Sequence, residues 1–320
     1  MQGARIATRM AQELQEGRLS MEGLVKLAFY CFTAASIAVF ASAICYVAYG
    51  IGRIRVQRQV LTTPTGERIT STSAELGPGS VGAGRFGTLL AGFALVLTFF
   101  SVIARVGATK RGPYSNMYEF SIAFIFAILL IYLLFERSYK TKQLGSIVLP
   151  ITAGMAIYVW SLPSSLREST HLIPALQNNL LMTFHVSSAI FAYAAAAVSF
   201  AAAVFFLIQL HKNVSWLPSA DMLDDVGYRA VTIGFPLLTL TLILGSVWAH
   251  EAWGSYWSWD PKETSCLFTW LIYAIYLHTR SLRGWRGQRS AMILIVGFIA
   301  VMFTYYGNYF FGGLHAYGGV

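Results

Sequence analysis

Charged residues are scarce in this chain. They make up 12% of its 320 residues, whereas hydrophobic residues make up 56%. A typical soluble domain carries about 25% charged residues. Half that value leaves too little polar surface for a water-soluble globule of this size, so the composition favours a membrane-embedded protein. The net charge of +9 does not indicate nucleic-acid binding, because membrane proteins collect excess Lys and Arg in their cytoplasmic loops.

Cysteine is also scarce, and a cleavable signal peptide is lacking. Cys31, Cys45 and Cys266 all lie in apolar runs and none belongs to a Cys-x-x-Cys pair, so no zinc site, thiol–disulfide centre or disulfide framework is predicted. The mixed charges of Met1–Ser20 surround no apolar core, which argues against a signal peptide. Residues 7–17 are instead expected to form a short interfacial helix.

Long apolar runs are what the chain does contain. A membrane-spanning helix needs about 20 apolar residues, and eight runs reach or approach that length. They predict an all-α, polytopic membrane protein with about eight transmembrane helices. The runs are Leu27–Ile51, Phe86–Ala104, Met117–Phe135, Leu144–Leu166, Leu180–Leu210, Ala230–Ala249, Thr264–Thr279 and Ser290–Phe311.

Two regions follow from this pattern. Residues 1–110 are expected to hold the interfacial segment and two transmembrane helices, with a flexible cytoplasmic loop over Thr62–Gly87, which is rich in Gly, Ser and Thr. Residues 111–320 are expected to form a six-helix core. In the fourth run, Pro150 and Pro163 are expected to bend or end the helix. The seventh run is short and is expected to begin within the loop that precedes it.

The distribution of basic residues predicts the orientation in the membrane. The loops after the odd-numbered spans hold 14 of the 23 Lys and Arg residues, and cytoplasmic loops carry the excess of basic residues. These loops are therefore predicted to be cytoplasmic. Both termini and residues 248–263 are then predicted to lie at the outer side of the membrane.

Residues 248–263, between spans six and seven, read WAHEAWGSYWSWDPKE. Aromatic residues at a membrane interface commonly form a belt of scattered rings, but here half of the chain's tryptophans occur within twelve residues. Such a cluster favours a flat, apolar platform for a large planar ligand. The aromatic residues are Trp248, Trp253, Tyr256, Trp257 and Trp259.

Three of the six histidines are candidate metal ligands, because ionisable residues inside a membrane usually have a function. His185 lies five residues into span five, and at about 1.5 Å per residue this places it only ~8 Å below the outer end. His315 follows span eight, at the same face. A neutral imidazole is a common axial ligand of haem iron, so the pair is a candidate haem site. His278 lies ~22 Å along span seven from Glu263, and a second ligand at that depth would have to come from another chain.

The segment WGSYWSWDPKE resembles the WWD motif of haem-handling membrane proteins. The segments LFTWLIYAIYLHTR, GLHAYG, NNLLMTFHVS and SNMYE resemble the CcsA family of system II cytochrome c synthases, in the order of that family and over about residues 105–320. The chain departs from the family pattern at His250, where asparagine is usual, and in Ala108–Tyr114, which lacks the usual histidine.

This resemblance implies a function and a set of site residues. CcsA-type proteins, with a ResB/CcsB-like partner, carry haem b to the outer surface and attach it to the Cys-x-x-Cys-His motif of apocytochrome c, which is a lyase (synthase) activity. The resemblance implies that His185 and His315 are axial ligands of the outer haem. It also implies that the WWD loop, with Trp253, Trp257, Trp259 and Asp260, holds the haem edge, and that His278 pairs with a histidine of the partner. No catalytic residue is assigned.

Several alternatives remain open at this point. The same loop would suit an exporter of haem or of another small molecule that performs no ligation chemistry. A system I relative shares a WWD loop, and a purely structural membrane subunit would not need three histidines placed in this way. Asp260, which precedes Pro261, is also a candidate cap of span seven, and Lys262 is a candidate partner for a propionate. A thiol-reducing partner is possible for the apocytochrome.

Overall fold

The computed structural model describes residues 2–61, 78–167, 179–214, 216–280, 282, 285–307 and 312–315. This part of the chain forms eight α-helices and one short 3-10 helix, and it contains no strand. The elements are α1 (Gln2–Leu61), α2 (Pro78–Thr109), α3 (Met117–Tyr139), α4 (Gly145–Ser161), η1 (Ser164–Arg167), α5 (Asn179–Lys212), α6 (Ala220–Trp253), α7 (Pro261–Arg280) and α8 (Gln288–Tyr306).

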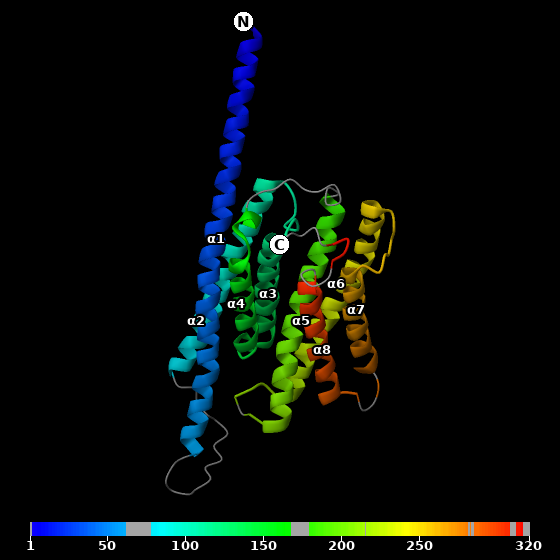
Figure 1. The fold of residues 1–320 in the computed structure, drawn as a ribbon. Coiled ribbons are helices and arrows are strands. Elements are labelled where there is room, and N and C mark those ends of the chain that lie inside the picture. The colour runs from blue at the N-terminus through cyan, green and yellow to red at the C-terminus, as the bar shows by residue number, and fades with distance from the viewer. Residues whose placement is uncertain are drawn as a thin grey trace.

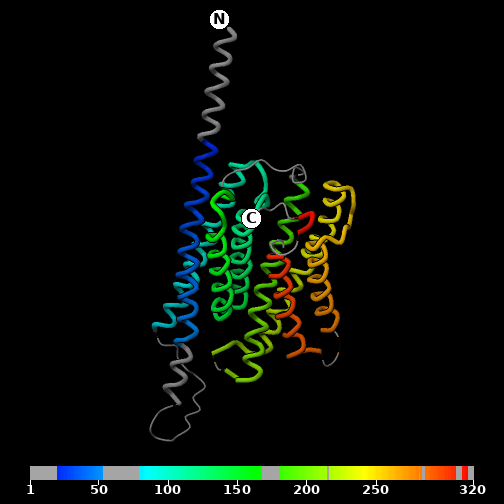
Figure 2. Tube along the Cα trace, viewed as in Figure 1, coloured from blue at the N-terminus to red at the C-terminus, as the bar shows by residue number. Residues whose placement is uncertain are grey.

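Successive helices run up and down through one bundle (Figure 1). The trace in Figure 2 follows the same path: α1 and α2 lie side by side at one edge, α6 and α7 lie at the other, and α3 and α5 lie between them. The start of α5, the end of α6, the start of α7 and the segment 312–315 all lie at the same end of the bundle. Residues that are far apart in the sequence therefore meet at that end.

The expected all-α, polytopic membrane protein is confirmed. Among the described residues, six helices are long and apolar enough to cross a membrane, namely α1, α2, α3, α5, α6 and α8. The other two are α4, whose 17 residues extend only ~26 Å, and α7, whose 20 residues include charged residues at both ends. With these two, the chain passes eight times through the bundle.

The central helices pack closely because their contact faces carry small residues. In α5 the runs Ala194–Ala197 and Ala201–Ala203 are fully or almost fully buried. Opposite them on α6 stands Gly234, where an added Cβ would lie 3.1 Å from the Cβ of Ala195. Lipid gives helices no hydrophobic reason to associate, so close backbone approach at small residues supplies much of the packing energy.

Several boundaries differ from those expected. The helix of the fourth run ends at Ser161 rather than at 166, because Leu162, which precedes Pro163, is extended (φ −68°, ψ 146°), as the residue before a proline prefers. Pro150 lies inside α4. The seventh helix begins at Pro261 within the preceding segment, as expected. Residues 7–17 are part of α1 and do not form a separate helix.

The expected loop over Thr62–Gly87 is wrong for its last ten residues. Residues 78–87 belong to α2, which begins with Pro78, the position that proline favours in a helix. Residues 62–77 lie outside the described part of the chain. The glycines that suggested a loop allow close packing instead, since an added Cβ at Gly84 would lie 2.8 Å from Cδ2 of Tyr49.

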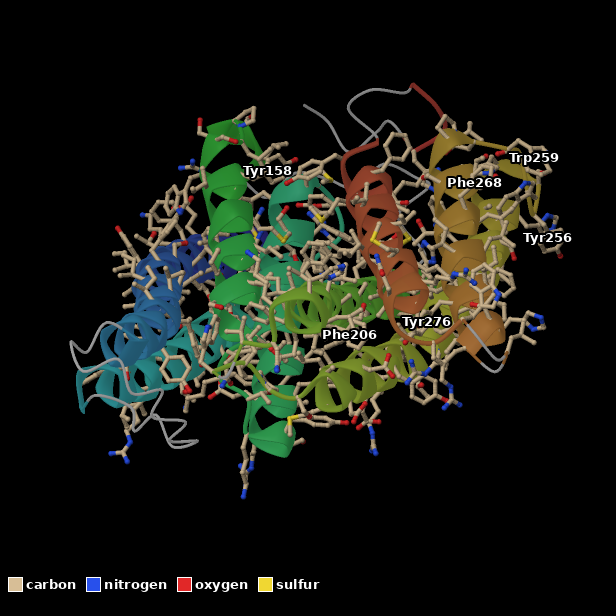
Figure 3. The ribbon with its side chains drawn as sticks, turned by 90° about the horizontal axis from the view of Figure 1, so that it is seen from below. Tyr158, Phe206, Tyr256, Trp259, Phe268 and Tyr276 are labelled. Atoms are coloured by element: carbon tan, nitrogen blue, oxygen red, sulfur yellow. The ribbon has the colours of Figure 1, made fainter. Side chains whose placement is uncertain are left out.

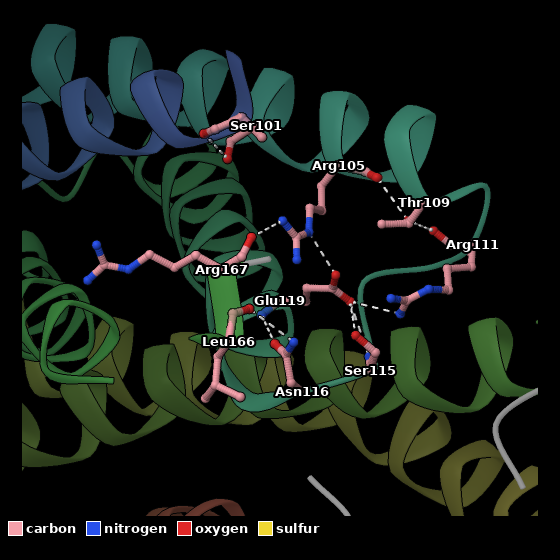
Figure 4. Close-up of polar contacts among 10 residues, drawn as sticks. Ser101, Arg105, Thr109, Arg111, Ser115, Asn116, Glu119, Leu166 and Arg167 are labelled. Carbon is pink, nitrogen blue, oxygen red and sulfur yellow. Dashed lines mark hydrogen bonds and ion pairs between the residues drawn. The ribbon is translucent and has the colours of Figure 1, made fainter. Parts of the chain in front are cut away.

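A buried ion-pair cluster joins the end of α2 to the start of α3 (Figure 4). The Glu119 carboxylate accepts hydrogen bonds from Arg105 Nε at 2.8 Å, from Arg111 Nη1 at 3.3 Å and from Ser115 Oγ at 2.6 Å. The backbone N–H of Glu119 donates to Asn116 Oδ1, which caps α3. Because each donor stands on a different turn or helix, the cluster fixes where α3 begins.

We expect Arg105→Ala to destabilise the protein strongly. Arg105 and Glu119 expose only 6% and 1% of their side chains, and a buried pair that loses one partner costs about 3–5 kcal/mol. Because Arg111 still contacts Glu119, we expect about 3 kcal/mol. A lower midpoint of thermal unfolding, followed by tryptophan fluorescence in detergent, would report it.

Arg229→Ala is the matched control. It breaks another pair of an arginine with a carboxylate, that of Asp225, in which the side chains expose 64% and 42%. Exposed pairs contribute little to stability, so the midpoint should hardly change. Equal losses in the two variants would contradict a stabilising role for the Glu119 cluster.

Candidate functional site

His185 and His315 line one cavity at the end of the bundle where the loop 254–260 lies. The space between its walls, counted together with the open solvent at its mouth, is about 1020 Å³. Its walls come from α3, α5, α6, α7 and α8, and most of them are apolar or aromatic. Met117 and Phe120 face it from α3, and Trp257 from the loop.

The backbone of α6 fixes the orientation of the His185 ring. His185 Nδ1 lies 2.9 Å from the carbonyl oxygen of Thr241. A carbonyl oxygen only accepts, so Nδ1 carries the proton and donates it, and Nε2 carries the lone pair. Gly245, one turn further along α6, makes room for the ring, since an added Cβ there would lie 2.6 Å from His185 Cε1.

A carboxylate fixes the orientation of the His315 ring in the same sense. His315 Nδ1 lies 2.8 Å from Asp260 Oδ2. Burial raises the pKa of the Asp260 carboxyl, but the hydrogen bonds from His315 and from the backbone N–H groups of Lys262 and Leu314 outweigh burial and lower that pKa to about 2. The ionised carboxylate accepts the Nδ1 proton, so in the neutral ring Nε2 of His315 carries the lone pair.

Asp260 is also the cap of α7, as its place before Pro261 suggested. Its Oδ2 accepts from the backbone N–H of Lys262 at 2.9 Å, and its Oδ1 accepts from the backbone N–H of Leu314. The Glu263 carboxylate accepts from the backbone N–H groups of Ser258 and Asp260. This exchange between the cap and the third helical residue is a capping box, and it ties the segment 312–315 to the start of α7.

Two tryptophans pack on the histidines. Trp248 is 1% exposed; its ring lies nearly parallel to that of His185, with centroids 6.3 Å apart, and 5.6 Å from that of His315. Trp253 meets Trp248 edge to face at 4.6 Å and His315 at 5.2 Å. Among the described residues, the buried indole N–H of Trp253 has no acceptor.

The rest of the loop is divided between the cavity and the outside. Trp257 lines the cavity, whereas Trp259 is 69% exposed. Trp259 has a φ of +59°, which is uncommon for a bulky residue, and this backbone turn directs its side chain outward just before Asp260 turns inward. Tyr256, also exposed, stacks on His250 at 4.2 Å. Figure 3 shows Tyr256 and Trp259 at the margin of the molecule.

His278 lies near the other end of α7, far from the cavity (Figure 1). Its side chain is exposed on the surface of the bundle. The structure therefore brings His185, His315, Trp253, Trp257 and Asp260 together and leaves His278 and Trp259 at the surface.

Two residues of this site are not predicted by the sequence. Thr241 and Gly245 orient and accommodate His185, yet both lie in the apolar run of α6 and neither carries a chemical signal. Trp248 is one of the predicted aromatic residues, and in the structure it is buried and contacts the rings of both histidines. The roles of Thr241 and Gly245 depend on which turn of α6 lies level with His185, and the sequence does not show this.

The chain belongs to the cytochrome c assembly family: residues 114–315 match the family described as "Cytochrome C assembly protein". The match includes the whole cavity wall and both histidines. Curated relatives carry one name, "Cytochrome c biogenesis protein CcsA". The resemblance to the CcsA family that the sequence predicted is confirmed.

Three such relatives give the extent of the similarity. The protein of Chlamydomonas reinhardtii is 40% identical over 240 residues, which cover 72% of this chain and 67% of the relative. That of Mesostigma viride is 37% identical over 264 residues, with 73% and 86% covered. That of Synechococcus elongatus is 37% identical over 257 residues, with 64% and 79% covered.

We expect Gly245→Ala to displace the His185 ring and weaken any metal ligation by it. The added methyl group would lie 2.6 Å from Cε1, which no side-chain contact tolerates, so the ring must leave Thr241. Titration of the purified protein with haemin, followed by absorption, should give an affinity at least about tenfold weaker. Gly154→Ala in α4, where an added Cβ meets nothing within 4 Å, should bind like the wild type; equal affinities in all three proteins would contradict the role of Gly245.

We expect Asp260→Asn and Asp260→Ala to separate the two roles of Asp260. Asparagine caps a helix about as well as aspartate, so Asp260→Asn should keep the unfolding midpoint but lower haemin affinity about 10- to 100-fold, as loss of a carboxylate behind a ligating histidine does. Asp260→Ala should lower both. A normal haemin affinity in Asp260→Asn would show that the carboxylate does not support His315.

The pH dependence of this contact follows from the lowered pKa. A carboxylate with a pKa of about 2 in the folded protein stabilises the fold above the ordinary value of 3.8, and this contribution is lost only as the pH falls towards 2. The wild-type haemin affinity should therefore stay independent of Asp260 titration between about pH 5 and 9. A loss of affinity that tracks protonation of Asp260 in that range would overturn the assignment.

Proposed function

We propose that this chain binds haem b between His185 and His315 at the outer end of the bundle and presents it for attachment to apocytochrome c. In this proposal it acts in cytochrome c biogenesis as the CcsA-type subunit of a synthase, together with a ResB/CcsB-like membrane partner. The observation that carries the proposal is the pair of histidines in one cavity, each with its Nδ1 proton held by an acceptor. Metal-ligating histidines almost always have this arrangement, because it fixes the ring and directs Nε2 to the metal.

The cavity suits a large planar ligand with a few polar groups. It is lined mainly by apolar and aromatic side chains and has an open mouth, as sites for large apolar ligands commonly do. Trp248 and Trp253 pack on the histidine rings. Neutral imidazole is the form of histidine that binds iron.

The proposed reaction adds the two thiols of a Cys-x-x-Cys-His motif across the two vinyl groups of haem. Each thiol sulfur bonds to one vinyl carbon and the proton goes to the other, so no oxidant or reductant is consumed. Haem supplies the reactive vinyl groups. The protein contributes by holding the macrocycle still and shielding it, and correct placement of two reactants can lower a barrier by several kcal/mol.

His278 supports the second part of the proposal, in which haem passes through a site shared with a partner. His278 is exposed near the end of α7 opposite to the cavity. An exposed imidazole on a membrane helix is costly in lipid unless another chain covers it. The distribution of Lys and Arg residues supports an orientation with the cavity at the outer side and His278 towards the cytoplasm.

We expect His185→Gly with His315→Gly to abolish the outer haem site. The full chain would be purified in detergent after expression with and without a ResB-like partner, and reduced-minus-oxidised spectra would be recorded. The wild type should show a haem b signal, and the double variant should lose most of it. Added imidazole should restore the signal, because it can fill the space that each ring leaves.

His211→Gly provides a matched control. His211 stands at the other end of α5 and is exposed, so its loss should leave the spectrum unchanged. Absence of haem from every wild-type preparation, with the partner present, would refute the proposal. It would return the choice to an exporter or a structural subunit.

A further inference from the structure

The segment Asp260–Glu263 carries three charges, and two of them are used by the structure itself. Asp260 binds His315 and two backbone N–H groups. Glu263 holds Ser258 and the backbone of Asp260. Both carboxylates stand at the N-terminus of α7, where the helix dipole stabilises negative charge. Neither carboxylate therefore depends on a lysine for its stability.

Lys262 differs from its two neighbours. It lines the cavity together with His185 and His315. Within the described part of the chain, its ammonium group makes no hydrogen bond and no ion pair, whereas its backbone N–H donates to Asp260 and its backbone carbonyl accepts from Ser265. An ammonium group in a mainly apolar cavity is costly unless an anion pairs with it. A ligand with a carboxylate at this wall would remove that cost.

Axial ligation leaves one degree of freedom of a bound macrocycle undetermined. Two histidines fix the position of the iron and the direction of the axis through it, but a planar ligand can still rotate about that axis. The two propionates of haem lie on one edge of the ring and the two vinyl groups lie away from them. Rotation therefore decides which edge meets an arriving thiol, and near-attack geometry requires that it be fixed.

We propose that Lys262 binds a propionate of the haem in this cavity and thereby sets the rotation of the macrocycle. The inference rests on the function proposed above and names the residue that positions the ligand within that site. With the propionate edge at the start of α7, the vinyl edge points away from α7. Lys262 is a positioning residue in this proposal and not a catalytic one, because it touches no reacting atom.

The test compares two ligands and two proteins. Haemin and haemin dimethyl ester, in which both carboxylates are blocked, would be titrated into the purified full chain and into Lys262→Met, a variant of similar size without charge. The wild type should bind haemin about 10- to 100-fold more tightly than the ester, since hydrogen bonds to charged groups have this strength. Lys262→Met should bind the two ligands equally.

Two further variants complete the design. Lys262→Arg keeps the charge and should restore much of the preference for haemin, while Lys212→Met, at the exposed end of α5, should behave as the wild type. Resonance Raman spectra report the propionate and vinyl groups directly, and both sets of bands should change in Lys262→Met while the bands of bis-histidine iron remain.

The outcomes separate this inference from the proposed function. An equal preference for haemin in the wild type and in Lys262→Met, or unchanged propionate bands, would overturn the role of Lys262 while leaving the bis-histidine site in place. Loss of the bis-histidine spectrum in Lys262→Met would also overturn it, because a positioning residue should not be needed for ligation. Failure of the wild type to bind either ligand would refute the proposed function itself.

Discussion

The contact between Asp260 and His315 determines how the end of the bundle around the cavity is built. One carboxylate caps α7, accepts from the backbone of Leu314 and holds the His315 ring. The segment that follows α8 is thus tied to a helix that begins more than fifty residues earlier in the chain. This contact is strengthened by charge. The hydrogen bonds from His315, Lys262 and Leu314 lower the pKa of Asp260 to about 2. The carboxylate therefore stays ionised and continues to accept them.

The His185 ring is held in its orientation by different contacts. His185 depends on a backbone carbonyl of α6 and on the absence of a side chain at Gly245, so its position is set by how α5 and α6 pack. That packing relies on small residues along both helices. His315 is therefore held by a local charge and His185 by the packing of the helices. A change in that packing would move His185 relative to His315, which stays with α7.

The sequence could predict the helices and the depth of the histidines, but not the contacts among them. Apolar length determines which segments span a membrane, and the rise per residue placed His185 and His315 at one end. Because α5 is apolar on all sides, hydropathy does not tell which face presents His185, so Thr241 and Gly245 could not be foreseen. The glycines near residue 84 suggested a loop, yet in the protein they allow α2 to approach Tyr46 and Tyr49. A helix is the structure that satisfies the backbone there.

The two ends of the bundle differ in what they need from other molecules. At the end that holds the cavity, one chain supplies both imidazoles, their acceptors and the aromatic walls. At the other end His278 stands exposed, and a comparable site there would need a second chain to supply a ligand and to cover it. In the proposed function, this difference between the two ends gives haem transfer a direction. Haem held between two chains is released when the chains separate. Haem that reaches the cavity meets two imidazoles that are already oriented for it. The protein then needs no conformational change at the outer site to accept haem, because the hydrogen bonds to Thr241 and Asp260 have fixed both rings in advance.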